Sequence, residues 1–347
     1  MKIAIIGGGI VGSTAAYYLS KSKEVTIDLY DDNLYSGTKA AVGIICPWIT
    51  QRVNKAWYAL VEDGANFYQQ LFKDLQDTSF MTASGAIIMN PNKHDYLLDL
   101  AKKRLEANPI MAAVEEITET DLLPHNFKFD KGIYIKGAFR IDGRKYLEVI
   151  HSKMDTVNFI HKQTTLSHLL TKGYDKILIC AGGRFLDAFD LKGYKVDHFN
   201  QKGMLLVYPY HTNNYAIAIP KGEIDFLFDN NSLVIGASHE KDYTHMGYDE
   251  IVAKDLINQA TKYMTLPKST PSYRIGLRSN NRLNLPFYGK CDGFEDVYIT
   301  GGLGSSGLTS GPIIGYRLAQ HLLYGTELDD RYNLTQFVHL KKEIEHD

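Results

Sequence analysis

Hydrophobic positions along the chain change repeatedly between a strand-like and a helix-like period. Lys2–Ile6 is a short β-branched run typical of a buried parallel strand, and apolar residues then recur at helical spacing from Val11 to Lys21. Val25–Tyr30 fits a second strand. The same periods predict helices at 57–75, 95–108 and 146–154, and a further strand at 176–181.

The pattern changes between residues 196 and 236, where short strand-like runs dominate. They lie at 204–208, 215–219, 225–228 and 232–235, with turn residues at Gly222 and at 229–231. This spacing predicts an antiparallel sheet. A helix at 249–264, a strand at 296–300, a glycine-rich loop and a helix at 312–324 are predicted after it.

The order of these elements predicts an α/β protein with a discontinuous nucleotide-binding domain and a second, inserted domain. We assign residues 1–80, 140–195 and 290–347 to the nucleotide-binding domain. Residues 81–139 and 196–289 are assigned to an inserted α+β domain that is built on the antiparallel sheet.

Composition excludes several classes of protein. The chain has 347 residues, of which 44% are hydrophobic and 22% charged, so intrinsic disorder is not expected. A formal net charge of −2 provides no basic field, and we expect no nucleic-acid partner. Three widely spaced cysteines (Cys46, Cys180 and Cys291) form no disulfide framework, which favours a cytoplasmic location. Without an apolar stretch of membrane-spanning length, no stable membrane insertion is expected.

Residues 7–12 match the dinucleotide-binding pattern G-x-G-x-x-G. Gly7 allows the tight turn, Gly9 lets the backbone approach a diphosphate, and Gly12 lets the following helix pack closely on the sheet. The helix N-terminus adds a partial positive charge for the phosphates. The alternative is a glycine-rich turn without a ligand, but here the pattern follows a strand and opens a helix, as the fingerprint requires.

An acidic residue is also expected at the end of the second strand, where it would bind a ribose hydroxyl. Asp31 occupies that position, with Asp32 as the alternative. Two more glycine-rich strand ends occur at 177–183 and 297–304. A chain that only bound NAD would usually lack them, so the pattern favours FAD.

Several segments together resemble the FAD-dependent D-amino-acid oxidase superfamily, and the pattern is most similar to glycine oxidase and related amine oxidases. They are residues 2–12, 38–43, 201–203, 276–278, 286–289 and 301–315. Two positions depart from the superfamily pattern, because Ser279 replaces a proline and Lys39 replaces a small serine. These departures leave the substrate open.

The resemblance implies a Rossmann-type FAD-binding domain, a substrate-binding domain and noncovalently bound FAD. The implied cofactor-binding residues are Gly7, Gly9, Ile10, Val11, Gly12, Asp31, Asp32, Thr38, Lys39, Ala40, Gly43, Ile44, Ala181, Gly182, Gly302, Gly304, Ser305, Ser306, Gly307, Leu308 and Thr309. A helix that opens at Gly311-Pro312 is expected to direct its N-terminus at the flavin. No metal site is expected, because the twelve histidines show no zinc-binding spacing.

For the substrate, the resemblance implies a clamp by Arg278, since a guanidinium binds a carboxylate through two parallel hydrogen bonds. Arg274 and Arg282 are alternatives. Tyr208 and Tyr215 are predicted to contact the substrate from the sheet, and Tyr210 is a further candidate.

The expected activity is oxidation of the C–N bond of a small amino acid or secondary amine, with O₂ or another electron acceptor. Three alternatives remain: a 2-hydroxy-acid dehydrogenase, a flavin-binding redox component without turnover of its own, and an oxidase acting on a modified nucleoside or a protein-borne amine.

Overall fold

The first predicted strand lies inside a six-stranded sheet because its residues are apolar on both faces. The computed structural model describes residues 1–52, 54–212, 215–221, 224–229 and 231–341. The sheet has the order β17 (Phe287–Lys290), β18 (Val297–Gly301), β10 (Lys176–Ile179), β1 (Lys2–Ile6), β2 (Thr26–Tyr30) and β9 (Val157–Ile160). Neighbouring strands are parallel except for the antiparallel pair β17 and β18. After β9 the chain crosses to the other side of β1 and forms β10, so the ends of β1 and β10 form the switch point at which such sheets bind ligands.

The predicted antiparallel sheet is present, and it is larger than the sequence pattern indicated. Its order is β16 (Ser272–Asn280), β12 (Phe199–Pro209), β15 (Ser232–Gly236), β14 (Asp225–Asp229), β13 (Ala216–Pro220), β5 (Ala86–Met89), β7 (Gly132–Lys136) and β6 (Ala113–Ile117). Only β13 and β5 pair in parallel. Three strands from residues 81–139 therefore complete a sheet whose other five strands lie within residues 199–280. Of the predicted turn residues, Gly222 and Asn230 lie outside the described residues.

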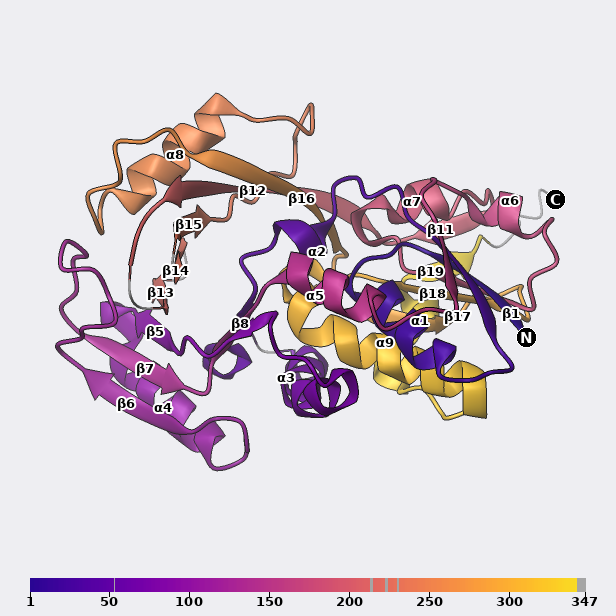
Figure 1. The fold of residues 1–347 in the computed structure, drawn as a ribbon, viewed down its shortest axis with the longest axis horizontal. Coiled ribbons are helices and arrows are strands. Elements are labelled where there is room, and N and C mark those ends of the chain that lie inside the picture. The colour runs from indigo at the N-terminus through magenta and orange to yellow at the C-terminus, as the bar shows by residue number, and fades with distance from the viewer. Residues whose placement is uncertain (53, 213–214, 222–223, 230, 342–347) are drawn as a thin grey trace, which may run out of the picture.

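Alternate side chains of this sheet point to two different cores. Met204, Phe226 and Phe228 pack beneath α8 (Glu250–Ala260), whereas Leu205 and Leu227 belong to the core shared with the six-stranded sheet. Figure 1 shows α8 on the outer face of the sheet, and β12 and β16 running towards the nucleotide-binding lobe. The inner face of the sheet therefore faces the carboxyl ends of the parallel strands.

Two small sheets and several short helices complete the chain. β3 (Ile44–Ile45), β8 (Phe139–Ile141) and β4 (Met81–Thr82) form one sheet, and β11 (Tyr194–Val196) pairs with β19 (Val338–Leu340) in the other. Besides α8 and the helices that pack beside the parallel sheet, the α-helices are α2 (Gly37–Ala40), α4 (His94–Leu105), α5 (Gly143–His151), α6 (Leu166–Leu169) and α7 (Phe185–Ala188). The 3₁₀ helices are Pro47–Ile49, Pro91–Lys93, Gly182–Arg184, Gly304–Ser306, Asp330–Tyr332 and Leu334–Gln336. Since β17 begins at Phe287, the boundary expected at residue 290 cuts through a strand of the parallel sheet.

The C-terminal helix begins earlier than expected. α9 spans Gly307–Tyr324, so Pro312 lies inside the helix and not at its first position. Proline cannot donate a hydrogen bond to the carbonyl four residues earlier, which is that of Leu308. The hydroxyl of Tyr68, on α3 (Lys55–Leu75), donates to this carbonyl at 2.6 Å. A side chain from another helix therefore compensates for the missing backbone donor.

Three helices pack closely beside the parallel sheet because glycines face neighbouring backbones. A Cβ atom on Gly315 of α9 would lie 2.6 Å from the carbonyl oxygen of Val11 in α1 (Ile10–Ser20). A Cβ atom on Gly64 of α3 would lie 2.2 Å from the carbonyl oxygen of Thr309. These contacts hold α9 close to both α1 and α3.

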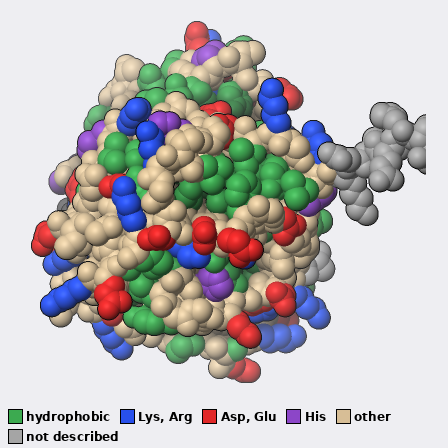
Figure 2. Space-filling view, turned by 90° about the vertical axis from the view of Figure 1, so that its right-hand side faces the viewer, with side chains coloured by type: hydrophobic (Ala, Val, Ile, Leu, Met, Phe, Trp, Pro, Cys, Tyr) green, Lys and Arg blue, Asp and Glu red, His purple; other side chains and the backbone are tan. Residues whose placement is uncertain are grey.

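The end of the molecule formed by the nucleotide-binding lobe carries both signs of charge. Figure 2 shows acidic and basic side chains interspersed with apolar ones on this face, without a continuous basic surface. Within the described residues, no helix is both long enough and apolar enough to cross a membrane.

Candidate active site

A cavity of about 540 Å³ runs from the glycine-rich turn after β1 to the inner face of the eight-stranded sheet. It brings together predicted residues that are far apart in the chain. Those that line it are Gly7, Gly9, Ile10, Val11, Asp31, Asp32, Thr38, Ala40, Gly43, Ile44, Ala181, Gly182, Arg278, Gly304, Ser305, Gly307 and Leu308. Gly12, Lys39, Gly302, Ser306 and Thr309 do not line it.

The glycine-rich turn leaves backbone exposed to the cavity at the start of α1. Gly7 has a φ of +102°, and a Cβ atom there would lie 2.4 Å from the carbonyl oxygen of Cys180, at the end of β10. A Cβ atom on Gly12 would lie 1.9 Å from the carbonyl oxygen of Gly7, so Gly12 is needed for packing and not for ligand contact. The N-cap residue Gly9 has no side chain, and the first turn of α1 has no acidic residue. The helix N-terminus can therefore bind an anion.

The two candidate carboxylates after β2 have different partners. Asp31 accepts hydrogen bonds from the backbone N–H of Gly8 at 2.5 Å and of Asn33 at 2.6 Å. Asp32 instead forms an ion pair with Arg184, from the 3₁₀ helix after β10. Asp31 is thus held against the glycine-rich turn, as a ribose-binding carboxylate must be. Asp32 ties the end of β2 to the end of β10.

The 38–43 segment forms α2 and the turn that follows it, beside the start of α1. The Thr38 hydroxyl accepts a hydrogen bond from the N–H of Ile10 at 3.0 Å. Lys39 points elsewhere, because its Nζ donates to Asn33 and its side chain lines a separate pocket. Gly43 has a φ of +94°, and a Cβ atom there would lie 1.9 Å from the carbonyl oxygen of Ile141. The departure from the resembled pattern at Lys39 therefore lies outside the main cavity.

The loop after β18 forms another part of the cavity wall. The 3₁₀ helix Gly304–Ser306 leads directly into α9, whose first turn has no acidic residue. The helix N-terminus that faces the cavity is consequently at Gly307, five residues before the predicted start. Ser279, the other departure, accepts a hydrogen bond from the N–H of Gly302 at 2.9 Å and contacts His198 at 3.0 Å. Ser279 therefore supports the loop through its hydroxyl.

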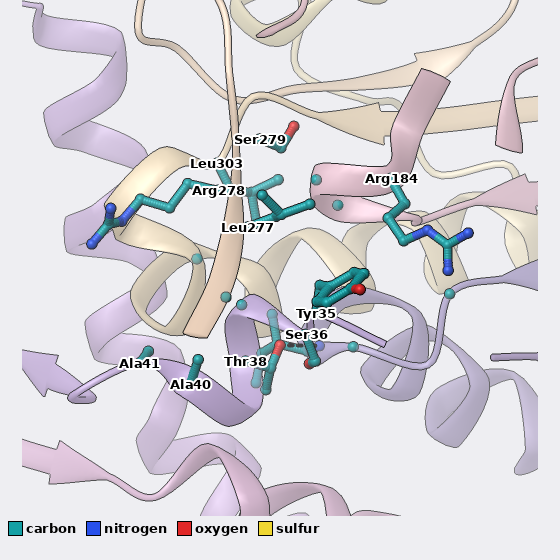
Figure 3. Close-up of a pocket in the computed structure, with 18 of the residues that line it drawn as sticks. Tyr35, Ser36, Thr38, Ala40, Ala41, Arg184, Leu277, Arg278, Ser279 and Leu303 are labelled. Carbon is teal, nitrogen blue, oxygen red and sulfur yellow. Dashed lines mark hydrogen bonds between the residues drawn. The ribbon is translucent and has the colours of Figure 1, made fainter. Parts of the chain in front are cut away.

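Arg278 is the one of the three candidate arginines that lines the cavity. Figure 3 shows Arg278 and Leu277 leaving β16 on opposite sides, above α2. Nη1 of Arg278 donates to the carbonyl oxygen of Ser238 at 2.9 Å. Its contact with Gln201 is longer, at 3.5 Å. Nε and Nη2 make no hydrogen bond to a described residue, so donors remain for a bound carboxylate.

The alternative arginines and the candidate tyrosines lie elsewhere, which corrects the predicted tyrosine contacts. Arg282 is exposed and pairs with Asp197, and Arg274 does not line the cavity. Tyr208 is buried in the core beneath α8, since it shares the outward face of β12 with Met204 and Leu206. Tyr210 packs against that core, and Tyr215 precedes β13 without lining the cavity.

Comparison with known proteins agrees with this geometry. A family model described as FAD dependent oxidoreductase matches residues 2–321. The chain belongs to this family. It is therefore an FAD-dependent oxidoreductase, and the expectations for fold class, cofactor and enzyme class are confirmed.

Relatives in this family include oxidases of small amines. The chain is 27% identical to "Uncharacterized oxidoreductase YurR" of Bacillus subtilis, over 94% of this chain and 96% of the relative. Iminodiacetate oxidase from Chelativorans sp. BNC1 has a similar structure, with a TM-score of 0.85 and 25% identity, over 95% of this chain and 98% of the other. Glycine oxidase from Geobacillus kaustophilus has a TM-score of 0.79 and 15% identity, over 99% and 98% of the two chains.

The geometry of the residues that line the cavity fits FAD, independently of the comparisons. The exposed backbone at Gly7 and Gly9 and the uncompensated N-terminus of α1 suit a diphosphate, and Asp31 suits a ribose. The buried Oγ1 of Thr300, at the end of β18, has no hydrogen-bond partner in the described structure, although Thr300 lines the cavity. A ligand with hydrogen-bonding groups would satisfy it.

Sequence reasoning missed several residues that line the cavity, and these include Arg184, Thr300, Asp225 and His239. Arg184 directly follows the glycine-rich strand end at 177–183, and Thr300 lies within the one at 297–304, so both had a usable signal in the sequence. Asp225 lies on β14 of the eight-stranded sheet, where strand pairing decides which face a side chain lies on, and His239 lies in the segment that follows β15.

Proposed function

We propose that this protein oxidises the C–N bond of a small amino acid or secondary amine, giving an imine that is hydrolysed in water. The observation that carries the proposal is the position of Arg278. Its unused donors face the cavity from the substrate sheet, beyond the glycine loops that hold the cofactor. FAD, when bound, supplies the hydride acceptor at flavin N5.

The protein's own residues would bind and orient the substrate. Arg278 would bind the substrate carboxylate in two parallel hydrogen bonds, because its Nη1 alone is committed to the backbone of Ser238. Gly203 provides the room, since a Cβ atom there would lie 2.8 Å from the guanidinium Cζ. Burial lowers the pKa of Arg278, but a guanidinium remains charged at any physiological pH.

Noncovalent attachment of FAD is part of the same proposal. Burial raises the pKa of the Cys46 thiol to about 12 and that of the Cys291 thiol to about 11. Burial also raises the pKa of Cys180, which lines the cavity wall. All three thiols remain protonated at neutral pH, and a protonated thiol is a poor nucleophile.

Anaerobic reduction of the bound flavin tests the proposed activity. The purified yellow holoprotein is mixed with glycine, sarcosine, both enantiomers of proline, a panel of D-amino acids, glycolate and lactate. We expect amines to bleach the flavin absorbance and the two hydroxy acids to leave it unchanged. Bleaching by hydroxy acids alone would instead favour a hydroxy-acid dehydrogenase. No bleaching by any compound would contradict the proposal and favour a redox component.

Substitution of Arg278 tests the carboxylate clamp. Arg278→Lys keeps the charge but loses the bidentate geometry, so the apparent Kd of the reducing amine should rise roughly 10- to 100-fold. Arg282→Lys is the matched control, because Arg282 is exposed and lies only four residues further along the chain. FAD content should be unchanged in both variants. An unchanged apparent Kd in Arg278→Lys would rule out the clamp.

A further inference from the structure

Asp225 places a carboxylate on the inner face of the substrate sheet. It lies on β14 and pairs with Gly236 of β15, which in turn pairs with Leu205 of β12. Its neighbour Phe226 points into the core beneath α8, so Asp225 points the opposite way, and it lines the cavity. Of the carboxylates that line the cavity within the described residues, the other three are Asp31, Asp32 and Asp187, outside this sheet.

This carboxylate has no partner of its own in the described structure. The carboxylate of Asp225 takes part in no hydrogen bond or ion pair there, although the residue is at least half-buried. Burial raises the pKa of Asp225 to about 7, and the charge of Arg278 opposes that rise. His239 also lines the cavity, and its pKa is lowered by burial and by Arg278. His239 is therefore neutral when Asp225 is ionised.

Two glycines and one leucine lie between Arg278 and Asp225 on this face of the sheet. The guanidinium of Arg278 lies against Gly203 of β12, where a Cβ atom would collide with it. Between β12 and Asp225 lies Gly236, and the side chain of Leu205 covers it, since a Cβ atom on Gly236 would lie 2.3 Å from Cδ2 of Leu205. Two strand spacings, roughly 10 Å, separate β12 from β14. The sheet thus presents a cation and an anion to the same cavity, and their side chains form no hydrogen bond with each other in the described structure.

We propose that Asp225 binds the cationic nitrogen of the substrate while Arg278 binds its carboxylate, which makes the cavity selective for zwitterions over carboxylic acids that lack an amine. The inference rests on the proposed function. It adds the residue that distinguishes an amino acid from a carboxylate of similar shape that has no cationic nitrogen. A buried carboxylate without a partner destabilises the empty site, and a bound ammonium group removes that cost. Charge-assisted hydrogen bonds between the two groups add to the affinity.

A matched pair of ligands separates the contribution of Asp225 from that of Arg278. Sarcosine and methoxyacetate have similar shape and share the carboxylate, but an ether oxygen replaces the cationic nitrogen. Proline and tetrahydro-2-furoate form an equivalent cyclic pair. Binding of the ethers is followed by perturbation of the oxidised flavin spectrum. The apparent Kd of the amines comes from the concentration dependence of anaerobic flavin reduction.

Asp225→Asn is expected to raise the apparent Kd of the reducing amine roughly 10- to 100-fold. The Kd of the matching ether should stay the same or fall, because the variant removes a negative charge near a bound anion. Asp225→Glu should recover part of the amine affinity. Asp255→Asn on α8 is the control, since it removes the same charge from the other side of the sheet. Arg278→Lys should weaken both ligands.

The outcomes separate this inference from the activity on which it rests. If no amine reduces the wild-type flavin, the proposed function fails. If amines reduce the wild type and Asp225→Asn binds them as tightly as before, the function stands and the role of Asp225 is refuted. Equal weakening of the amine and its ether analogue would also refute it, because a general disturbance of the cavity would explain both.

Discussion

At the residue scale, the charge of Asp225 affects stability as well as binding. Its pKa is raised from 3.8 to about 7 in the folded protein, so the folded state binds a proton that the unfolded state has already released. The free energy of unfolding should therefore fall as the pH rises from about 4 to about 7. Above that range the full cost of the buried charge is present.

Asp225→Asn should consequently stabilise the substrate-free holoprotein at pH 8, by an amount on the order of 2 kcal/mol. The two proteins should approach equal stability below about pH 3, where Asp225 is largely protonated in both states. Thermal unfolding at both pH values measures the difference. A variant less stable than the wild type at pH 8 would show that Asp225 has a structural partner.

At the element scale, α9 depends on a hydroxyl from α3. Pro312 leaves the carbonyl of Leu308 without its helical donor, and Tyr68 supplies one at 2.6 Å. Both groups are buried, so water cannot replace the bond. The N-terminal turn of α9 borders the cavity, and this contact therefore links the core to the site.

Tyr68→Phe should lower the free energy of unfolding by about 1–3 kcal/mol, because it leaves a buried carbonyl unpaired. Adding Pro312→Ala restores a backbone donor and should recover most of that loss. Tyr96→Phe, at an exposed tyrosine, is the control and should have little effect. Chemical denaturation of the four proteins measures these differences. If the double variant is no more stable than Tyr68→Phe, the Tyr68 hydroxyl does not replace the backbone donor that is missing at Pro312.

At the scale of the whole molecule, the cofactor site joins segments from most of the chain. The cavity is lined by the ends of β1, β2, β10 and β18, by α2, and by strands of the eight-stranded sheet. A ligand bound there contacts the folded state only, so it stabilises the protein by mass action.

Removal of FAD should lower the melting temperature, and FAD at 100 times its Kd should raise it again by roughly 5 °C. FMN lacks the adenosine monophosphate part of FAD, and therefore the adenosine ribose proposed to bind Asp31 and one of the two phosphates proposed to bind the N-terminus of α1. It should therefore restore much less of the stability. Differential scanning calorimetry of the apoprotein with each ligand measures this. Equal stabilisation by FMN and FAD would contradict the assignment of the glycine-rich turn to the diphosphate.

The dinucleotide half of the site was largely predictable because its groups lie in one continuous stretch of chain. The turn at Gly7, the helix start and Asp31 follow rules of local backbone geometry, and these act over about 30 residues. The sequence also indicated Arg278, through the resemblance of its motif. The start of α9 was misplaced, because a proline favours the first turn of a helix unless another segment replaces its donor.

The substrate half was decided by tertiary structure. A strand directs alternate side chains to opposite faces, and the pairing of β12, β15 and β14 determined that Asp225 lines the cavity while Tyr208 lies beneath α8. The face that each residue takes depends on which side of the sheet another layer covers. The local sequence thus determined a dinucleotide-binding turn. Long-range strand pairing and packing placed the two opposite charges across one cavity, because no local rule relates residues that are separated by more than 50 positions.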